Sequence, residues 1–185
     1  VPRVCEVSEG SIKVAGVDVR EMTQHELRDR IGLVPQKGNL FSGTIRSNLK
    51  YGAPEATDEE LEEVIRIAQA KEFIDQKEER FDMEISQGGT NVSGGQKQRL
   101  AIARAIAKNP DIYIFDDSFS ALDFKTDAKL RQELNQLVKK TKSTVLLVGQ
   151  RIASIMDADQ IIVLDEGRIV GKGTHEELMK SCQVY

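Results

Sequence analysis

Four consecutive residues, Ser93-Gly94-Gly95-Gln96, have the types and spacing of a helix start that could bind phosphate. Ser93 and Gln96 fit a capping box, in which each side chain pairs with the backbone N–H of the other residue. The capping box does not account for the two glycines, which cost about 1 kcal/mol each relative to alanine inside a helix. Glycines at a helix start leave backbone N–H groups open to an anion, which the helix dipole also favours.

Two carboxylates, Asp116 and Asp117, follow the apolar run of residues 112–115. The run does not alternate between apolar and polar residues, which is typical of a strand buried on both faces of a parallel sheet. Open α/β sheets bind ligands at the carboxyl ends of their strands. A solvated loop explains two acids equally well when they are seen alone. Beside an anion-binding helix start, a magnesium–phosphate site is the better interpretation.

Alternating strands and helices are expected to position these residues. Asn109-Pro110 ends the helix that begins at Gln96 and runs to about Lys108, because the residue before proline disfavours the helical region. Buried strands are predicted at residues 31–34, 112–115 and 144–148, hairpins at 11–19 and 161–170, an amphipathic helix at 127–140, and capped helices after Thr23, Thr57 and Thr174. This order predicts an α/β fold with a parallel-sheet core and an antiparallel portion.

Length and composition exclude several classes of protein. The chain has 185 residues and a mass of 20.6 kDa, which is enough for one domain with a core. No apolar run reaches the roughly 18 residues that a membrane span needs. The net charge of −4 argues against a nucleic-acid partner. Cys5 and Cys182 lie at opposite ends without metal-ligand spacing, so we expect reduced thiols, as in cytosolic proteins.

The order of these stretches resembles that of ATP-binding cassette (ABC) ATPases over essentially the whole chain. Residues 92–96 are similar to the signature motif, with Val92 in the usual leucine position, residues 112–116 resemble the Walker B strand, and residues 120–123 resemble the D-loop. The resemblance implies one nucleotide-binding domain with a P-loop NTPase-like core. That core would comprise residues 1–39 and 108–185, with a mostly helical subdomain of residues 40–107 inserted into it.

The resemblance also implies roles for single residues, with ATP and Mg²⁺ as cofactors. Asp116 and Gln36 would serve the magnesium of Mg-ATP. The Gln36 amide would also reach the attacking water and sense the transmembrane partner. The signature residues Ser93, Gly94, Gly95 and Gln96 would hold the ATP of a second cassette, in a heterodimer or a homodimer. Asp123 would bridge the two sites across their interface. These roles place the chain at the cytoplasmic face of the cell membrane.

Two further stretches resemble the exporter branch of this family. In residues 40–49, exposed apolar side chains would suit docking of a coupling helix of the transmembrane domains, whereas core packing of Leu40 and Phe41 explains them equally well. Residues 83–89 stand where exporters carry the x-loop, with Glu84 as the candidate carboxylate for cross-talk with the transmembrane domains.

Three departures from the family pattern concern the nucleotide site of this chain. No G-x-x-x-x-G-K-[ST] loop is present, and residues 167–173 have the wrong spacing for one, so we expect the sequence to begin after that loop. Asp117 stands where the family has a glutamate as general base, and a shortfall of about 1 Å can cost ~100-fold in rate. Gln150 replaces the switch histidine and cannot titrate near neutral pH. The substitutions at Asp117 and Gln150 together predict a degenerate site.

Three hypotheses therefore remain open. The leading one is the nucleotide-binding domain of a heterodimeric exporter, in which the intact signature serves the partner's site. The second is a regulatory or interaction module that binds no nucleotide itself, which the missing phosphate loop supports. The third is a soluble cassette protein of DNA repair or translation, against which residues 40–49 argue.

Overall fold

The computed structural model describes residues Val1 to Tyr185, which form two compact units. The first unit is Val1–Leu146 and the second is Leu147–Tyr185. The boundary falls within strand β7 (Thr144–Val148). The division into a core of residues 1–39 and 108–185 and a subdomain of residues 40–107 is a different partition of the chain and stays a prediction.

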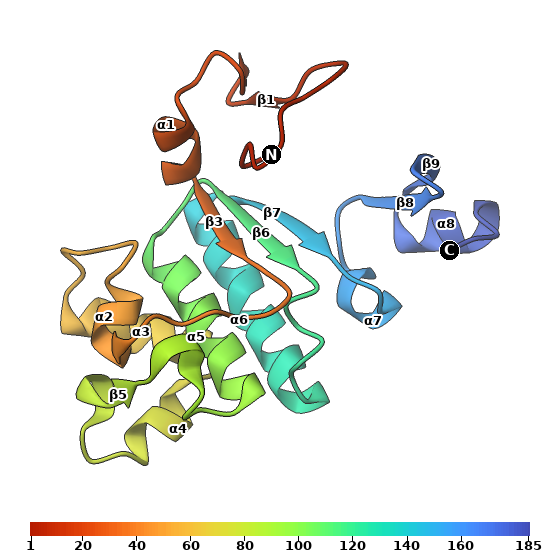
Figure 1. The fold of residues 1–185 in the computed structure, drawn as a ribbon. Helices are drawn as coiled ribbons and strands as arrows, with labels where there is room; N and C mark the ends of the chain where they lie inside the picture. Colours follow the sequence, from red (N-terminus) through yellow and green to blue (C-terminus); the bar gives the residue numbers. More distant parts are fainter. The chain divides into compact units, whose positions relative to one another are not determined.

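The predicted parallel strands are present and form a three-stranded sheet. Its order is β3 (Ile31–Val34), β6 (Ile112–Asp116) and β7 (Figure 1). Strands β3 and β6 are parallel, with Val34 opposite Phe115. Residues Tyr113, Ile114 and Phe115 are buried, as the uninterrupted apolar run predicts. Because both strands run in the same direction, the residues that follow them lie at one edge of the sheet.

Strand β7 is less buried than the sequence predicts. Its residues alternate between half-buried and exposed along the strand, and Leu146 and Val148 are 42% and 54% exposed. The prediction that this strand is buried is wrong, because the side chains on one face of β7 are exposed; the strand also lies at the edge of the sheet, with one neighbour. Apolar composition alone does not distinguish an edge strand from a central one.

The two longest helices are α5 (Gly94–Ala107) and α6 (Phe124–Thr141). Helix α5 packs against β3, and α6 lies behind β6 and β7 in the view of Figure 1. Helix α6 begins three residues before the predicted start, because the Asp123 side chain caps it. The apolar residues predicted to face the core from α5 are all buried, namely Leu100, Ile102, Ala103 and Ile106.

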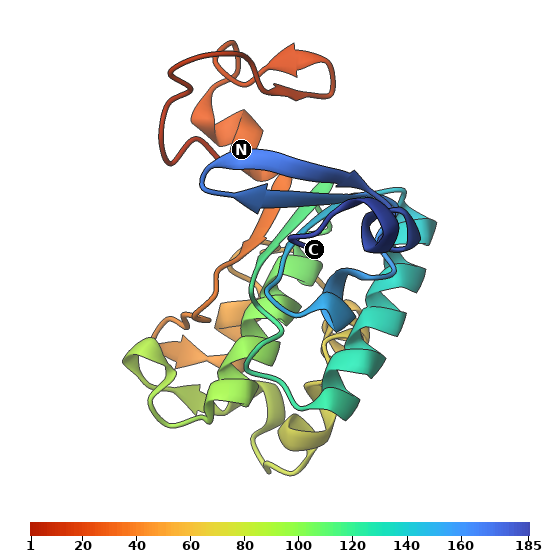
Figure 2. The same ribbon diagram turned by 90° about the vertical axis from the view of Figure 1, so that its right-hand side faces the viewer.

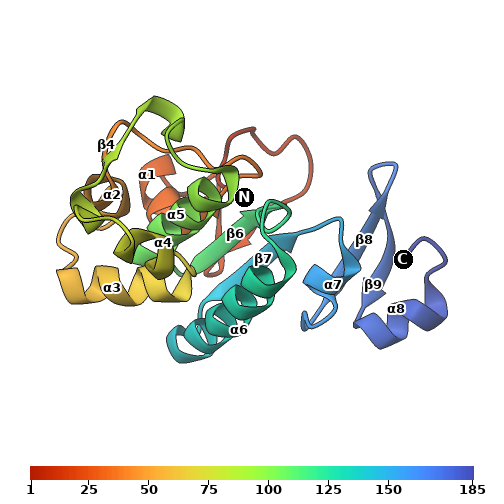
Figure 3. The same ribbon diagram turned by 90° about the horizontal axis from the view of Figure 1, so that it is seen from below.

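Short elements surround α5 in the middle of the chain (Figure 3). Thr57 caps α3 through the predicted capping box with Glu60. The elements are β4 (Gly43–Thr44), α2 (Ile45–Leu49), α3 (Asp58–Ile67), α4 (Lys71–Asp75), a 3₁₀ turn (Arg80–Asp82), β5 (Glu84–Ile85) and a second 3₁₀ turn (Gln87–Gly89). Strands β4 and β5 form an antiparallel pair.

The amino-terminal part of the first unit lies at the start of β3 (Figure 2). It contains the predicted hairpin of β1 (Lys13–Val14) and β2 (Val17–Asp18), followed by α1 (Gln24–Asp29), which the predicted capping box of Thr23 begins. These elements share a small apolar core made of Val14, Val19, Leu27, Ile31 and Ile114.

The second unit contains a short helix, a hairpin and a terminal helix. These are α7 (Ile152–Ile155), β8 (Ile161–Asp165), β9 (Arg168–Gly173) and α8 (His175–Ser181). Residues 167–173 therefore belong to an antiparallel hairpin, which confirms that they are not a phosphate loop. None of the helices in the chain combines the length and apolar character that crossing a bilayer requires.

Candidate functional site

The residues that follow β3 and β6 meet at the carboxyl edge of the sheet. Gln36 comes two residues after the end of β3 and donates a hydrogen bond from Nε2 to Oδ2 of Asp117, over 3.1 Å. Both residues were predicted from the sequence to belong to a magnesium–nucleotide site, with no predicted contact between them. The structure brings their side chains together.

The backbone around Asp117 is fixed by contacts that involve neighbouring serines. Asp117 has a φ of 45°, in the left-handed region that aspartate tolerates better than most residues. The buried Ser118 hydroxyl donates to the carbonyl of Val34 over 2.7 Å, which ties the end of β3 to the turn after β6. The Ser120 hydroxyl donates to the carbonyl of Asp117 over 2.8 Å. The backbone of Asp117 is therefore held by its own turn.

Asp116 has the surroundings expected of a metal ligand. Its side chain is exposed at the end of β6, and no other side chain pairs with it. The hydrogen bond between Gln36 and Asp117 uses the amide nitrogen of Gln36, which leaves its oxygen open. Mg²⁺ is bound through one or two carboxylates together with substrate phosphates and water. Asp116 and Gln36 fit such an ion when a phosphate supplies further ligands.

The start of α5 has the predicted capping box. Ser93 Oγ accepts a hydrogen bond from the N–H of Gln96 over 3.2 Å, and Gln96 Oε1 accepts one from the N–H of Ser93 over 3.0 Å. The N–H groups of Gly94 and Gly95 find no acceptor within the chain. Ser93 and Gly94 are exposed. The helix therefore begins with two open donors at its positive end.

The two glycines of α5 differ in their surroundings. A side chain added at Gly94 would meet nothing within 4 Å, so packing within the chain does not require glycine there. At Gly95 the nearest atom to an added Cβ would be the carbonyl oxygen of Ala121, at 3.5 Å. Ala121 lies in the segment of residues 120–123, which resembles the D-loop. The two stretches singled out in the sequence are therefore neighbours in space.

Asp123 has a local role that sequence analysis missed. It is the N-cap of α6, and its carboxylate accepts hydrogen bonds from the N–H groups of Lys125 and Thr126 and from the Thr126 hydroxyl. The hydrogen bond from the Thr126 hydroxyl, together with the backbone N–H bonds, lowers the pKa of Asp123. A bridging role between two sites stays a prediction. The missed signal is an aspartate placed three residues before Thr126, at a helix start.

Gln150 belongs to the second unit. It lies in the bend that follows β7, one residue before the N-cap of α7, and its side chain is exposed. Its place after the carboxyl end of a parallel strand agrees with the sequence prediction. Its role as a switch position stays a prediction.

The region after Gln36 exposes an aromatic pair. Leu40 is buried, whereas Phe41 is 45% exposed and Tyr51 is 69% exposed. The rings of Phe41 and Tyr51 have centroids 4.6 Å apart, and the Arg104 guanidinium lies 5.0 Å from the Phe41 centroid. Of the two explanations left open for Leu40 and Phe41, core packing therefore holds for Leu40, and an exposed apolar surface holds for Phe41.

Two amide side chains that were not singled out from the sequence hold the predicted x-loop and the loop of Gln36 in place. Asn91 Oδ1 accepts a hydrogen bond from the N–H of Ser86, and Asn91 Nδ2 donates to the carbonyl of Glu84, which fixes the predicted x-loop. Gln98 is buried and contacts the loop that contains Gln36. The available signal for Gln98 was a polar residue on the apolar face of a helix, where unpaired amides are costly.

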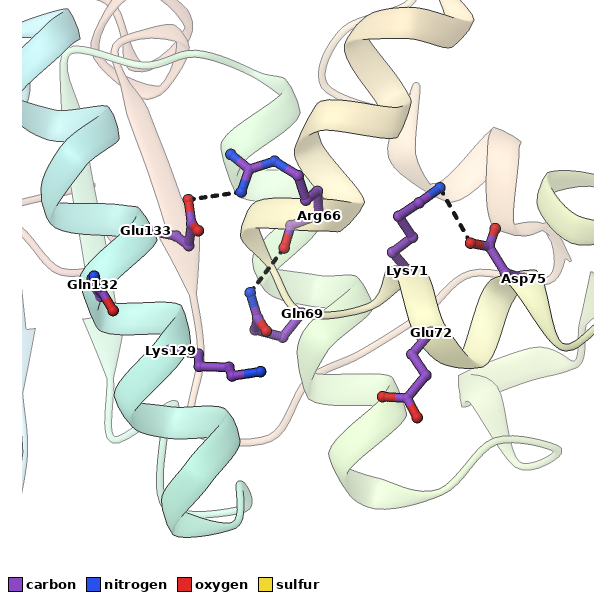
Figure 4. Close-up of a pocket in the computed structure, with 8 residues that line it drawn as sticks. All are labelled: Arg66, Gln69, Lys71, Glu72, Asp75, Lys129, Gln132 and Glu133. Carbon is purple, nitrogen blue, oxygen red and sulfur yellow. Dashed lines mark hydrogen bonds and ion pairs between the residues drawn. The ribbon is translucent and has the colours of Figure 1, made fainter.

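A surface pocket of about 530 Å³ lies between α3, α4 and α6, and none of the residues predicted to bind nucleotide lines it (Figure 4). Arg66 pairs with Glu133 across it, over 2.9 Å, and Lys71 pairs with Asp75 over 3.2 Å. The pocket is lined by Arg66, Gln69, Lys71, Glu72, Asp75, Lys129, Gln132 and Glu133. Its charged groups are mostly paired with one another, so it does not resemble the anion site expected for a triphosphate.

Comparisons with known proteins agree with this geometry. A family model described as ABC transporter matches residues 3–120. An uncharacterized ABC transporter ATP-binding protein of Mycobacterium tuberculosis is 47% identical over 99% of this chain and 31% of its own length. A putative multidrug export ATP-binding/permease protein of Staphylococcus aureus is 40% identical over 100% of this chain and 32% of its own length.

A solved structure of similar fold is a bacterial Atm1-family ABC exporter with ATP bound. It has a TM-score of 0.94 and 35% sequence identity, and the match covers 100% of this chain and 32% of that one. The chain therefore spans about a third of the length of the relatives that it matches.

Proposed function

Because the chain belongs to the ABC transporter family, we propose that it is an ATP-binding part of an exporter, in which ATP binding and hydrolysis power transport across a membrane. In this proposal the chain pairs with a second cassette, and each nucleotide lies between the core of one cassette and the signature residues of the other. ATP binding closes the pair, and hydrolysis opens it again.

The open start of α5 is the observation that carries the proposal. The N–H groups of Gly94 and Gly95 lack acceptors within the chain, and the space beside Gly94 is empty of the chain's own atoms. A helix start with free donors favours an anion. In the proposal, Ser93, Gly94 and Gly95 hold the γ-phosphate of the ATP in the partner's site. The adjacent segment of residues 120–123 then faces the same interface.

The chain's own site is proposed to bind Mg-ATP and to hydrolyse it poorly. Asp116 and Gln36 would hold the magnesium ion, which supplies charge neutralisation to the transferred phosphate. Asp117 occupies the position of the general base with a side chain one methylene shorter than glutamate. Its carboxylate is also engaged by Gln36. Gln150 cannot exchange a proton near neutral pH. Most turnover would therefore occur in the partner's site.

The aromatic pair Phe41 and Tyr51 is proposed to receive a segment of the transmembrane domains. Both side chains are exposed, and they lie on the region that follows Gln36. Aromatic side chains are enriched at the energetic centres of interfaces. Docking at this surface would place the chain at the cytoplasmic face of the membrane.

The test of the proposal is the variant Gly94→Glu in the complete transporter. A carboxylate at the helix start would repel the γ-phosphate of the partner's ATP, so we expect ATP turnover to fall by tenfold or more, although the partner's own residues are unchanged. Ala128→Glu is the matched control, because it adds the same charge at an exposed position of α6. Wild-type turnover in Gly94→Glu would contradict the proposal and favour the module that binds no nucleotide.

A further inference from the structure

Gln98 is a buried side chain whose amide spans the loop that contains Gln36. It is 2% exposed. Its Oε1 accepts a hydrogen bond from the N–H of Gly38 over 2.8 Å, and its Nε2 donates to the carbonyl of Pro35 over 3.3 Å. Both ends of the amide are therefore satisfied by the residues that flank Gln36 and Lys37. Loss of such partners leaves buried polar groups unpaired, which is costly.

The loop lies so close to α5 that Gly38 has no room for a side chain. A Cβ at Gly38 would be 2.8 Å from Gln98 Oε1 and 3.2 Å from two backbone atoms of α5, the Cα of Gln98 and the carbonyl oxygen of Lys97. The side-chain oxygen could move, but the helix backbone could not move without disturbing α5. Gly38 and Gln98 therefore form one contact that fixes the distance between the loop and the helix.

This contact connects two parts of the proposed nucleotide machinery. Gln98 lies four residues after Gly94, so it belongs to the part of α5 that is rigidly attached to the open helix start. At the other side of the loop, Gln36 is exposed and donates to Asp117. The contact between the loop and Gln98 of α5 therefore sets the direction in which the Gln36 side chain points.

We propose that Gln98 is a positioning residue: it holds residues 35–38 against α5, so that Gln36 stays directed at Asp117 and follows any movement of the helix start. The inference rests on the proposed function. It adds a residue that touches neither nucleotide nor metal and acts only through Gln36.

Hydrogen exchange of the backbone N–H groups of residues 36–39, measured in the complete transporter, tests the positioning directly. Gln98→Leu keeps the side-chain volume but removes both hydrogen bonds. Gly38→Ala adds a Cβ that pushes the loop away from α5. We expect both to exchange at least tenfold faster than the wild type, because protection depends on local opening. Gln136→Leu, at an exposed position of α6, is the control and should exchange as the wild type does. Wild-type protection in Gln98→Leu would overturn the inference.

Kinetics then test whether Gln98 acts through Gln36. We would use a transporter whose own site carries Asp117→Glu and Gln150→His and whose partner site is inactivated. There, Gln98→Leu should lower kcat about tenfold and change KM by less than twofold, since misplacement by about 1 Å can cost ~100-fold.

The decisive comparison adds Gln98→Leu to Gln36→Ala. Residues that act as one unit are not additive, so the double variant should have the kcat of Gln36→Ala alone. Effects that multiply would show that Gln98 acts independently of Gln36 and would overturn the inference. If the repaired site hydrolyses no ATP, the proposal about that site fails, and the exchange experiment still decides whether Gln98 positions the loop.

Discussion

The side-chain amide of Gln36 donates a hydrogen bond to the carboxylate of Asp117, with 3.1 Å between Nε2 and Oδ2. The two residues are 81 positions apart in the sequence and meet because β3 and β6 are parallel neighbours. The contact occupies one oxygen of the carboxylate that is proposed to stand at the general-base position. A carboxylate that is one methylene shorter than glutamate and already accepts a hydrogen bond from Gln36 is poorly placed to activate water. This agrees with the proposal of a degenerate site.

Repair of the chain's own site should require two substitutions. Asp117→Glu lengthens the carboxylate by one methylene, but Gln150 still lacks a titratable proton. In a transporter with the partner site inactivated, we expect Asp117→Glu alone to raise kcat for ATP only modestly, and Asp117→Glu with Gln150→His to raise it by tenfold or more. Nucleotide affinity should stay similar. Full activity in the single variant would show that Gln150 is not limiting.

We expect Asp116 to be the residue through which magnesium strengthens nucleotide binding. The Asp116→Asn variant removes the charge that a hard cation needs, so we expect affinity of the chain's own site for ATP in the presence of Mg²⁺ to fall about tenfold. Titration with and without EDTA measures it. Asp111→Asn, at the opposite end of the same strand, is the matched control, because its exposed ion pair with Arg30 contributes little. Equal effects of EDTA on wild type and Asp116→Asn would contradict the assignment.

The aromatic surface should couple ATP turnover to transport. Replacing Phe41 and Tyr51 together by alanine removes an exposed apolar surface from the region after Gln36. We expect transport per ATP hydrolysed to fall about tenfold, with ATP affinity changed by less than twofold. Measuring transport into vesicles and ATP hydrolysis in the same preparation gives the amount transported per ATP hydrolysed. Met179→Ala, which removes an apolar side chain exposed elsewhere, should leave the ratio unchanged.

Asp123 should give the cassette a dependence of stability on acid pH. The folded-state pKa of Asp123 is lowered by its hydrogen bonds with Thr126, so its contribution to stability is present above the ordinary value of 3.8 and is lost as the pH falls through the lowered pKa. Asn is also a good N-cap, and it does not titrate. We expect Asp123→Asn to melt near the wild-type temperature at pH 6 and to lose less stability below pH 4. If the melting temperatures of the wild type and Asp123→Asn fell by the same amount as the pH is lowered across this range, the result would contradict the capping role.

The sequence was most informative where structure depends on neighbouring residues. Thr23, Thr57, Ser93 and Thr174 all form the predicted capping boxes, because the groups that pair are three residues apart and need no distant partner. Strand β6 was predicted from the uninterrupted apolar run of residues 112–115. The N-cap role of Asp123 was not predicted, because Asp123 was assigned to the segment that resembles the D-loop.

Tertiary structure decided which apolar residues are buried and which polar residues meet. Strand β7 has the composition of a central strand and lies at the sheet edge. Leu40 and Phe41 are adjacent in the sequence, yet one is in the core and the other is exposed. These outcomes depend on which elements pack on each position, and no local pattern encodes that.

The sequence by itself determined the family resemblance, the candidate residues and the local helix starts, because each is a matter of residue type and short-range spacing. Only the tertiary structure decided that Gln36 reaches Asp117, that Gly95 lies beside Ala121 and that Gln98 holds the loop between Pro35 and Gly38. Those contacts join residues that are far apart in the chain, so they exist only once the sheet and α5 have packed together.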